Sequence, residues 1–411
     1  MNPSTSIFYV INCFLMIVSQ RRAMASATND QPNIYQHISR SSNKFCGTFY
    51  SNVAARIIDN VACSPLSTHI ILSLVAYGSR GKTADELKSG LYLTSEDSLE
   101  HNGFKTLLDA LNNVTDIELN VANNIYIQEN LSIVPDFLTI NSKFFYSITP
   151  TVDFKDSIES SKQINSWVEE KTNNKIKDVI SADDLNESTT IVLVNAIYFK
   201  GNWEHPFDVT FTEHRPFYIS KDTKRHVPTM FKKHKYAHGK AAKLNSRIIE
   251  LPYSNNNFSM LIILPNEIEG LRFLEKNFKP KSLKHIEWKT SEVEVYLPKF
   301  KVESTIDLED SLTEMGMGTM FSDLADLTGV AQGPLKVSKI VQKAFIEINE
   351  KGCEAAAATV VQIRLRRMVD QPEIFKVDRP FMFTIQHKPS NIPIFVGSIR
   401  DLQLLRKKDE L

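Results

Sequence analysis

The sequence predicts one large domain of the mixed α+β class. Residues 64–78 begin with cap-type residues, continue as an apolar helix pattern and end at a glycine. Residues 190–199 are nearly all apolar and rich in β-branched side chains, which is typical of a strand buried on both faces in the centre of a large sheet. No Pro/Gly/Ser-rich linker, internal repeat or charge block divides the 411 residues, so we expect a single domain.

Two further helices are expected. The segment Thr83-Ala-Asp-Glu86 has the spacing of a capping box that starts a helix. Residues 76–83 also satisfy a relaxed phosphate-loop pattern, but its first glycine is absent and a helix rather than a strand precedes it, so we prefer the capping box. In residues 164–180, apolar side chains lie among polar neighbours as in an amphipathic helix, namely Ile164, Trp167, Val168, Ile176 and Val179.

Each of two strand candidates places one amide side chain among apolar neighbours. Asn195 lies inside residues 190–199, and Gln342 lies on the apolar face of residues 340–349. Buried amides need hydrogen-bond partners, so Asn195 is expected to belong to a buried polar network.

A segment near the C-terminus joins a small-residue run to an arginine cluster. Alanine at positions 355–358 favours a helical turn, whereas the β-branched Thr359, Val360 and Val361 favour a strand. In a strand, alternate side chains lie on one face, and here the side chains of that face are small at first and larger later: Cys353, Ala355, Ala357, Thr359, Val361 and Ile363. Such a face is able to slide into a packed sheet.

Catalytic motifs are absent from the sequence. It contains no His-Glu-x-x-His, Gly-x-Ser-x-Gly or Cys-x-x-Cys pattern, and its 10 histidines are scattered. We therefore expect no enzyme activity, no metal and no cofactor.

The overall charge is balanced, with 48 basic and 48 acidic residues. No global field would draw the protein to nucleic acid or to an anionic membrane, so any charge-based recognition must be local. The cluster of Lys232, Lys233 and Lys235 is a candidate polyanion site, with a solvated face as the alternative interpretation.

Residues 1–27 have the pattern of a secretory signal peptide. An apolar stretch from Ile7 to Val18 is followed by a small-residue site at Ala25-Ser-Ala27, although no lysine or arginine precedes Ile7. The stretch is too short to span a bilayer, and no later apolar run is long enough. The folded domain is expected over residues 28–402.

The C-terminal tail, residues 403–411, ends in an address that a retrieval receptor reads in order to return proteins to the endoplasmic reticulum: Lys408, Asp409, Glu410 and Leu411. Four glycosylation sequons agree with a luminal route, at Asn113, Asn130, Asn186 and Asn257. The sequence thus predicts the endoplasmic reticulum lumen and secretory pathway, with some protein secreted.

Cysteine usage indicates a fold without a disulfide framework. Cys13 would leave with the signal peptide, and the remaining Cys46, Cys63 and Cys353 cannot all pair within one chain. A chain of this size can bury its core without disulfides, so stability must come from packing.

Several long motifs, in order, give the chain a resemblance to the serpins over about Ile34–Leu402. The motifs are Asn60-Val-Ala-Cys-Ser-Pro-Leu-Ser67, Asn195-Ala-Ile-Tyr-Phe-Lys-Gly-Asn-Trp203, Leu297-Pro-Lys-Phe300, Glu350-Lys-Gly-Cys-Glu-Ala-Ala-Ala-Ala-Thr359 and Asp378-Arg-Pro-Phe-Met-Phe383.

The resemblance implies a monomer with three β-sheets, eight or nine helices and an exposed reactive loop at about residues 350–376. It also implies a suicide-substrate mechanism, in which a serine protease attacks the loop and forms an acyl-enzyme, and the freed loop inserts into the main sheet as a new strand. Fifteen residues separate Gly352 from Arg367, and at roughly 3.3 Å each they would span about 50 Å. That length would carry the tethered protease from one end of the inhibitor domain to the other.

By position, the resemblance also implies a hinge, a shutter and a breach. Gly352 permits the backbone change of the hinge, and the alanines make insertion sterically easy. The hinge residues are Glu350, Gly352, Cys353, Glu354, Ala355, Ala356, Ala357, Ala358 and Thr359. The shutter is matched by Ser64, Ser67 and Asn195, with Gln342 where many members have a buried histidine, and the breach is matched by Trp203.

Cys353 replaces the usual threonine or serine of the hinge. As a small side chain it should still insert into the sheet. A redox hypothesis stays open beside this interpretation, in which a mixed disulfide at Cys353 adds bulk and blocks insertion.

The cluster Arg364-Leu-Arg-Arg367 has the substrate pattern of furin-like proprotein convertases, with Met368 after the cut. An extended substrate puts Arg364 and Arg366 on one side and Arg367 on the other. A protease that binds all three side chains therefore needs carboxylates on more than one wall of its substrate groove. The basic pattern favours the Arg367–Met368 bond, whereas family spacing from Gly352 favours Arg366–Arg367.

Other functions remain open. A trypsin-like protease would read mainly one arginine, the cluster could be plain solvated surface, and the loop could be cut as a simple substrate. A non-inhibitory chaperone resident in the endoplasmic reticulum is a further alternative, although the small hinge residues speak against it.

Overall fold

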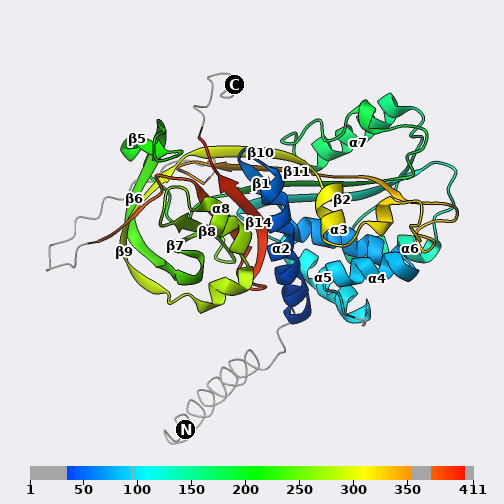
Figure 1. Ribbon diagram of the computed structural model, residues 1–411, viewed down its shortest axis with the longest axis horizontal. Coiled ribbons are helices and arrows are strands. Elements are labelled where there is room, and N and C mark those ends of the chain that lie inside the picture. The colour runs from blue at the N-terminus through cyan, green and yellow to red at the C-terminus, as the bar shows by residue number, and fades with distance from the viewer. Residues whose placement is uncertain (1–34, 95–96, 353–371, 403–411) are drawn as a thin grey trace, which may run out of the picture.

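The computed structural model describes residues 35–94, 97–352 and 372–402 (Figure 1). In these ranges the α-helices are α2 (Gln36–Arg56), α3 (Pro65–Gly78), α4 (Gly81–Gly90), α5 (Asp97–Asn112), α6 (Pro135–Ile140), α7 (Ser157–Lys171), α8 (Leu271–Asn277) and α9 (Glu309–Glu314). None of these helices is long and apolar enough to cross a membrane.

The strands of the described residues form two hydrogen-bonded sheets. The five-stranded sheet has the order β10 (Phe300–Asp307), β11 (Val337–Ile348), β4 (Ile191–Gly201), β2 (Ile117–Gln128), β3 (Thr151–Val152). The nine-stranded sheet has the order β1 (Val61–Cys63), β14 (Ile392–Ile399), β13 (Phe381–His387), β8 (Phe258–Pro265), β7 (Ser246–Pro252), β6 (Lys224–Ala241), β9 (Lys289–Pro298), β12 (Glu373–Lys376), with β5 (Glu213–Tyr218) paired to β6.

The α+β class expected from the sequence is confirmed, and the sheets differ from expectation only in how they are counted. The long strand β6 pairs with β5 and β9 along most of its length and with β7 at its end. The resemblance assigns these strands to separate sheets, and β6 joins them into one hydrogen-bonded network.

Strand β4 occupies the centre of the five-stranded sheet and is buried on both faces, as its sequence predicts. Ile191, Leu193 and Ile197 belong to the main core, which includes α3, whereas Val192 and Val194 pack with residues of α7. In Figure 1 the sheet accordingly runs between α3 on one side and α7 on the other. Two-sided burial explains why β4 shows no polar alternation.

Helix α3 has the limits that its sequence predicts. The Ser64 side chain caps it by accepting a hydrogen bond from the Ser67 N–H at 3.2 Å, and Pro65 occupies the first helical position, where no backbone donor is needed. Nearly every residue of α3 is buried, which explains its apolar composition.

The predicted capping box at Thr83 is wrong. Helix α4 begins two residues earlier, at Gly81, without a side-chain cap. The Glu86 carboxylate instead accepts hydrogen bonds from the Thr319 backbone N–H at 2.9 Å and hydroxyl at 2.7 Å, and the Thr83 hydroxyl accepts from the Asp326 N–H at 2.9 Å. Both side chains bind a distant segment in place of their own helix end.

The amphipathic helix predicted over residues 164–180 is only partly correct. Helix α7 starts earlier, where Asp156 caps it through the Glu159 N–H at 3.0 Å, and it ends at Lys171. Positive φ angles at Asn173 and Asn174 then turn the chain. Ile176 and Val179 are buried in the same apolar layer as α7, so these residues belong to a packed loop.

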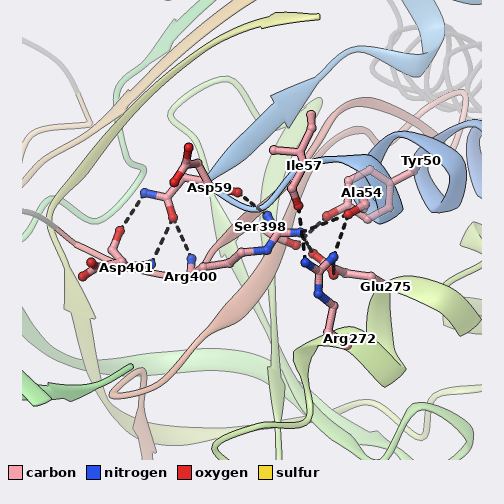
Figure 2. Close-up of polar contacts among 10 residues, drawn as sticks. Tyr50, Ala54, Ile57, Asp59, Arg272, Glu275, Ser398, Arg400 and Asp401 are labelled. Carbon is pink, nitrogen blue, oxygen red and sulfur yellow. Dashed lines mark hydrogen bonds and ion pairs between the residues drawn. The ribbon is translucent and has the colours of Figure 1, made fainter. Parts of the chain in front are cut away.

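A buried ion pair fixes the end of the described chain against α8 (Figure 2). Arg400 lies 2.6 Å from the Glu275 carboxylate, and Arg272 lies 3.7 Å from the same group. Arg272 also donates to the Ala54 carbonyl of α2 at 2.8 Å, and the Asn60 side-chain Oδ1 accepts from the Arg400 backbone N–H at 2.7 Å. Two arginines thus compensate one buried carboxylate and join α2, α8 and the strand end.

Cys46 and Cys63 are free and buried. Burial raises the pKa of each thiol well above the usual value for cysteine, so neither side chain is a reactive thiolate.

Candidate functional site

The predicted shutter residues lie at the boundary between β4 and β11, so the resemblance implies that an inserting strand would enter there. The two strands pair in parallel, with Val337 opposite Ile191 and Ile346 opposite Phe199. A chain that leaves β11 at Ile348 and folds back runs antiparallel to β11, and it is antiparallel to β4 as well. Insertion would therefore exchange one parallel pairing for two antiparallel ones, which are slightly more stable per residue.

Two amides hold this boundary at its midpoint. Gln342 and Asn195 are direct partners in the β4–β11 register, and the Gln342 Nε2 donates to the Asn195 Oδ1 at 2.5 Å. The Asn195 amide in turn donates to the Ser67 hydroxyl and to the Asn123 Oδ1. The buried polar network predicted around Asn195 is confirmed, and it includes the predicted residues Ser67 and Gln342.

Gln342 also joins β11 to the start of α3. Its Oε1 accepts from the Ser64 N–H at 2.8 Å, and its Nε2 lies 3.0 Å from the Ser64 carbonyl and 2.8 Å from the Thr68 hydroxyl. The glutamine side chain does not titrate, so this junction stays neutral at every physiological pH.

Asn123 and Thr68 complete the network, and sequence reasoning missed both. Asn123 of β2 accepts from the Ser67 hydroxyl at 3.0 Å and lies opposite Asn195 in the β2–β4 pairing. A signal existed in the polar pair Asn123-Asn124, which directly precedes the apolar residues 125–127 of the same strand. Its meaning depended on the strand register, which pairs Asn123 with Asn195.

Gly352 lies against the end of β4 in a conformation that requires glycine. Its φ is +81°, and a Cβ at this position would lie 2.4 Å from the Gly201 carbonyl oxygen and 2.5 Å from the Trp203 nitrogen. Any residue with a Cβ is disfavoured here, because the positive φ strains its backbone and the neighbouring backbone atoms leave no room for the Cβ. The predicted hinge glycine therefore also permits a close backbone contact.

Glu350 is buried and is held by three partners. Its carboxylate lies 3.0 Å from the Lys299 Nζ and accepts from the Thr212 hydroxyl at 2.8 Å. Its backbone carbonyl accepts from the Phe207 N–H at 2.8 Å. Burial alone would raise the pKa of the Glu350 carboxyl, but hydrogen bonds from its own backbone N–H, Lys299 and Thr212 outweigh burial and hold that pKa below its usual value.

Trp203 binds the segment that leads out of β11. Its indole N–H donates to the Asn349 carbonyl at 3.0 Å, and its backbone N–H donates to the Lys351 carbonyl at 3.2 Å. The indole is stacked on Tyr253 with ring centroids 4.6 Å apart. Trp203 was predicted to belong to the breach and Glu350 to the hinge. Contacts of both residues hold the same short segment after β11.

Two lysines of β11 fasten the loop that follows α7. The Lys343 Nζ donates to the Lys177 carbonyl at 2.7 Å and lies 2.9 Å from the Glu303 carboxylate of β10. Lys339 lies 2.8 Å from Asp184. Sequence reasoning did not single out either lysine, because the carbonyl that Lys343 binds belongs to a loop that was expected to be helical.

Other predicted site residues lie outside the described residues, so their roles stay predictions. These are Cys353, Glu354, Ala355, Ala356, Ala357, Ala358, Thr359, Arg364, Arg366, Arg367 and Met368, the tail residues Lys408, Asp409, Glu410 and Leu411, and the signal peptide at residues 1–27. The four sequon asparagines are all exposed, at positions 113, 130, 186 and 257. Their glycosylation also stays a prediction.

Comparison with known families gives a match along most of the chain. A family model described as Serpin (serine protease inhibitor) matches residues 40–402. Alaserpin of Manduca sexta is 38% identical over 386 residues, covering 92% of this chain and 96% of that protein. A leukocyte elastase inhibitor of Xenopus laevis is 36% identical over 377 residues, covering 88% of this chain and 98% of that protein.

Solved structures match the fold as well. The crystal structure of Serpin48 from the insect Tenebrio molitor aligns with a TM-score of 0.83 at 34% identity, covering 90% of this chain and 99% of that one. Uncleaved ovalbumin aligns with a TM-score of 0.80 at 27% identity.

Proposed function

The chain belongs to the serpin family of serine protease inhibitors, and from that premise we propose that it traps a furin-like proprotein convertase as an acyl-enzyme. The observation that carries this proposal is the sequence Arg364-Leu-Arg-Arg367, followed by Met368, in the segment between β11 and β12. Each guanidinium can make bidentate bonds to a carboxylate while keeping its charge, which suits a substrate groove with several acidic pockets. The attacked bond is Arg367–Met368 in this proposal.

Three contacts at the exit of β11 support a loop-insertion mechanism. Glu350 is bound by Lys299, Gly352 packs on Gly201, and Trp203 holds the Asn349 and Lys351 carbonyls. These contacts fix the start of the loop beside the end of β4. After cleavage at Arg367, the part of the loop that precedes the cut would stay covalently joined to β11. The amides of Gln342 and Asn195 mark the place where the sheet would have to part.

We propose the early secretory pathway as the place of action. The signal-like residues 1–27, the four exposed sequon asparagines and the C-terminal Lys-Asp-Glu-Leu support it. A retrieval receptor would be the partner that returns the protein to the endoplasmic reticulum. Convertases pass through the same route, so inhibitor and target would meet there.

The first test incubates the protein with furin and, separately, with trypsin, followed by denaturing electrophoresis. A furin complex that survives denaturation is expected, because the acyl bond is covalent. Cleavage of the loop by furin without a covalent complex would contradict the inhibitor role.

Arg364→Ala tests the convertase assignment. It should strongly weaken trapping of furin and spare trapping of trypsin, because a trypsin-like protease reads mainly one arginine. Lys351→Ala, which removes a nearby exposed charge outside the cluster, is the matched control and should leave both reactions unchanged. Equal loss against both proteases after Arg364→Ala would contradict the convertase assignment. The second candidate, an inhibitor of trypsin-like proteases with Arg366 attacked, predicts that Arg364→Ala leaves trapping of trypsin unchanged and that furin is not trapped.

Ala356→Arg tests insertion. A charge on the inserting strand would have to enter the closing sheet, so the variant should be cleaved as a substrate and released. Unchanged complex yield would show that insertion of this strand is not what traps the protease. The same variant would leave a chaperone function intact, so it also separates that alternative.

A further inference from the structure

Arg247 contacts three consecutive residues of β12, the strand that follows the predicted reactive loop. Its Nη2 donates to the Glu373 carboxylate at 3.0 Å and to the Ile374 carbonyl at 2.7 Å. The guanidinium carbon lies 5.1 Å from the ring centroid of Phe375, which is buried. His238 of β6 adds a further contact, with its Nδ1 3.6 Å from the Glu373 carboxylate. Arg247 belongs to β7, which does not pair with β12, so these contacts add to the strand pairing.

The strand pairing of β12 is limited. Four residues of β12 pair in parallel with β9, from Glu373 opposite Val293 to Lys376 opposite Tyr296. Among the described strands β12 is the last in the order of its sheet, so β9 is its one strand neighbour there. An edge strand forms backbone hydrogen bonds on one side only, and parallel pairs are slightly less stable per residue than antiparallel ones. The charged hydrogen bonds of Arg247 are therefore well placed to decide whether β12 stays paired.

The proposed insertion would lead away from β12. Gly352 lies against Gly201 at the end of β4, and an inserting strand would run from there toward Ile191 at the start of β4. The start of β4 pairs with the end of β2, and β2 leads into α6. In Figure 1, β9 lies toward the left end of the domain and α6 toward the right end. The inserting strand and β12 would thus extend toward opposite ends.

The length of the loop restricts insertion while the chain is uncut. The fifteen residues from Gly352 to Arg367 would span about 50 Å when extended, whereas the six residues from Arg367 to Glu373 reach only about 20 Å. An uncut loop that inserted as far as Arg367 would therefore have to pull β12 away from β9. Cleavage after Arg367 removes this restriction, because the part of the loop before the cut is then no longer joined to β12.

We propose that Arg247 is a positioning residue that keeps β12 paired with β9 until the loop is cut, so that insertion follows cleavage. It acts through Glu373, which lies six residues after the proposed P1 residue Arg367. This role rests on the loop-insertion part of the proposed function, and it does not depend on which serine protease is trapped.

Arg247→Ala is the test variant, and Arg215→Ala is its matched control. The two arginine side chains are equally exposed, at 33% each. Arg215 likewise forms an ion pair, 2.9 Å from Glu213, and lies 4.6 Å from the ring centroid of Tyr296, but neither partner belongs to β12. Both side chains are partly exposed, so the variants should fold, and thermal unfolding at neutral pH checks that they do.

Hydrogen exchange at the Val377 amide measures how firmly β12 is held. This amide directly follows β12 and donates to the Tyr296 carbonyl of β9 at 2.9 Å. In Arg247→Ala its exchange should become faster by about tenfold or more, which corresponds to about 1.4 kcal/mol of local stability. In Arg215→Ala it should change by less than about twofold on the same scale.

A double-mutant cycle with Glu373→Gln tests whether Arg247 acts through Glu373. Glu373→Gln should also accelerate exchange at Val377. The double variant should show less than the product of the two single effects, because both substitutions remove the same contact. A general structural role of Arg247 would instead give independent effects.

A third measurement follows the uncut protein during incubation at a raised temperature. Arg247→Ala should lose its ability to inhibit trypsin several times faster than the wild type, while mass spectrometry shows an intact chain. The reason is that release of β12 allows the uncut loop to insert. Arg215→Ala should lose inhibition at the wild-type rate.

Unchanged exchange at Val377 in Arg247→Ala, an equal change in Arg215→Ala, or independent effects in the cycle would overturn the role of Arg247 in holding β12. An unchanged rate of loss of inhibition would overturn its link to insertion. A wild type that trapped neither furin nor trypsin would instead contradict the proposed function, and the exchange results would still decide whether Arg247 holds β12.

Discussion

Gln342 of β11 and Asn195 of β4 lie opposite each other in a parallel pair, and the amide nitrogen of Gln342 donates to the side-chain oxygen of Asn195 at 2.5 Å. A side-chain hydrogen bond therefore joins the two strands that an inserting loop would separate in the proposed mechanism. The same amide also binds Ser64 at the start of α3, so one side chain joins this helix to the strand boundary.

Replacing Gln342 should destabilise the uncleaved protein. Gln342→Leu keeps most of the volume but leaves the Ser64 N–H and the Asn195 carbonyl without their partner, at a cost of about 2–4 kcal/mol for two buried groups. Thermal unfolding should occur at a lower temperature, and native gels of warmed protein should show inserted or polymeric forms earlier. Gln163→Ala, which changes an exposed glutamine of α7, is the control, and an equal effect there would contradict the role of the network.

Gly352→Ala should weaken the docking of the segment that leaves β11. The added Cβ would lie 2.4 Å from the Gly201 carbonyl oxygen, at a φ of +81° that alanine adopts only with strain. Hydrogen exchange at the Trp203 amide, which donates to Lys351, should become faster. Gly316→Ala is the matched control, since Gly316 has a φ of +85° with nothing within 4 Å of a Cβ. Both variants carry the backbone strain of about 1 kcal/mol, and only Gly352→Ala carries the clash.

The Glu350–Lys299 pair should show positive coupling in a double-mutant cycle. Glu350→Gln and Lys299→Met should each lower stability, and the double variant should lose less than the sum by about 1–3 kcal/mol. The Glu350 pKa is lowered in the folded state, so this contribution is present above the unfolded pKa and is lost as the pH falls through the lower folded value. Thermal unfolding of the four proteins at neutral pH gives the coupling, and Glu347→Gln on the exposed face of β11 should show none.

Buried histidines should make the protein less stable as the pH falls. Burial lowers the pKa of His69 from 6.5 to about 4, and the same cause lowers that of His387 to about 4. The unfolded chain then binds more protons, so stability is complete above about pH 6.5 and decreases toward pH 4, with about 2 kcal/mol lost per histidine by pH 5.

His69→Gln tests this pH dependence. The variant should have a lower unfolding temperature at pH 7.5, because His69 bonds the Leu91 carbonyl at 2.9 Å, but its unfolding temperature should fall less steeply with pH than that of the wild type. An identical slope for the two proteins would falsify the assignment to His69. Exposed His37→Gln should keep the wild-type slope.

Local patterns allowed much of the fold to be predicted. The limits of α3 could be predicted because its cap and first-turn proline mark its start and a glycine marks its end, all within the helix segment itself. The central position of β4 was readable because a strand buried on both faces must be apolar throughout. The need of Asn195 for partners also followed from its apolar surroundings alone.

Where sequence reasoning was wrong or silent, the partner lay far away in the chain. The Glu86 carboxylate had the spacing of a cap but binds Thr319, and the apolar Ile176 and Val179 had helical spacing but lie in a packed loop. Asn123 was missed because only the β2–β4 register places it opposite Asn195.

The sequence by itself determined the family, the run of small residues after Gly352 and the arginine pattern, because these are written in contiguous residues whose chemistry does not depend on distant contacts. Only the tertiary structure decided that Lys299 binds Glu350, that Gly352 packs on Gly201 and that Arg247 binds Glu373. Such contacts depend on strand register and on how elements cross, and both are set by packing of the whole core rather than by local propensity.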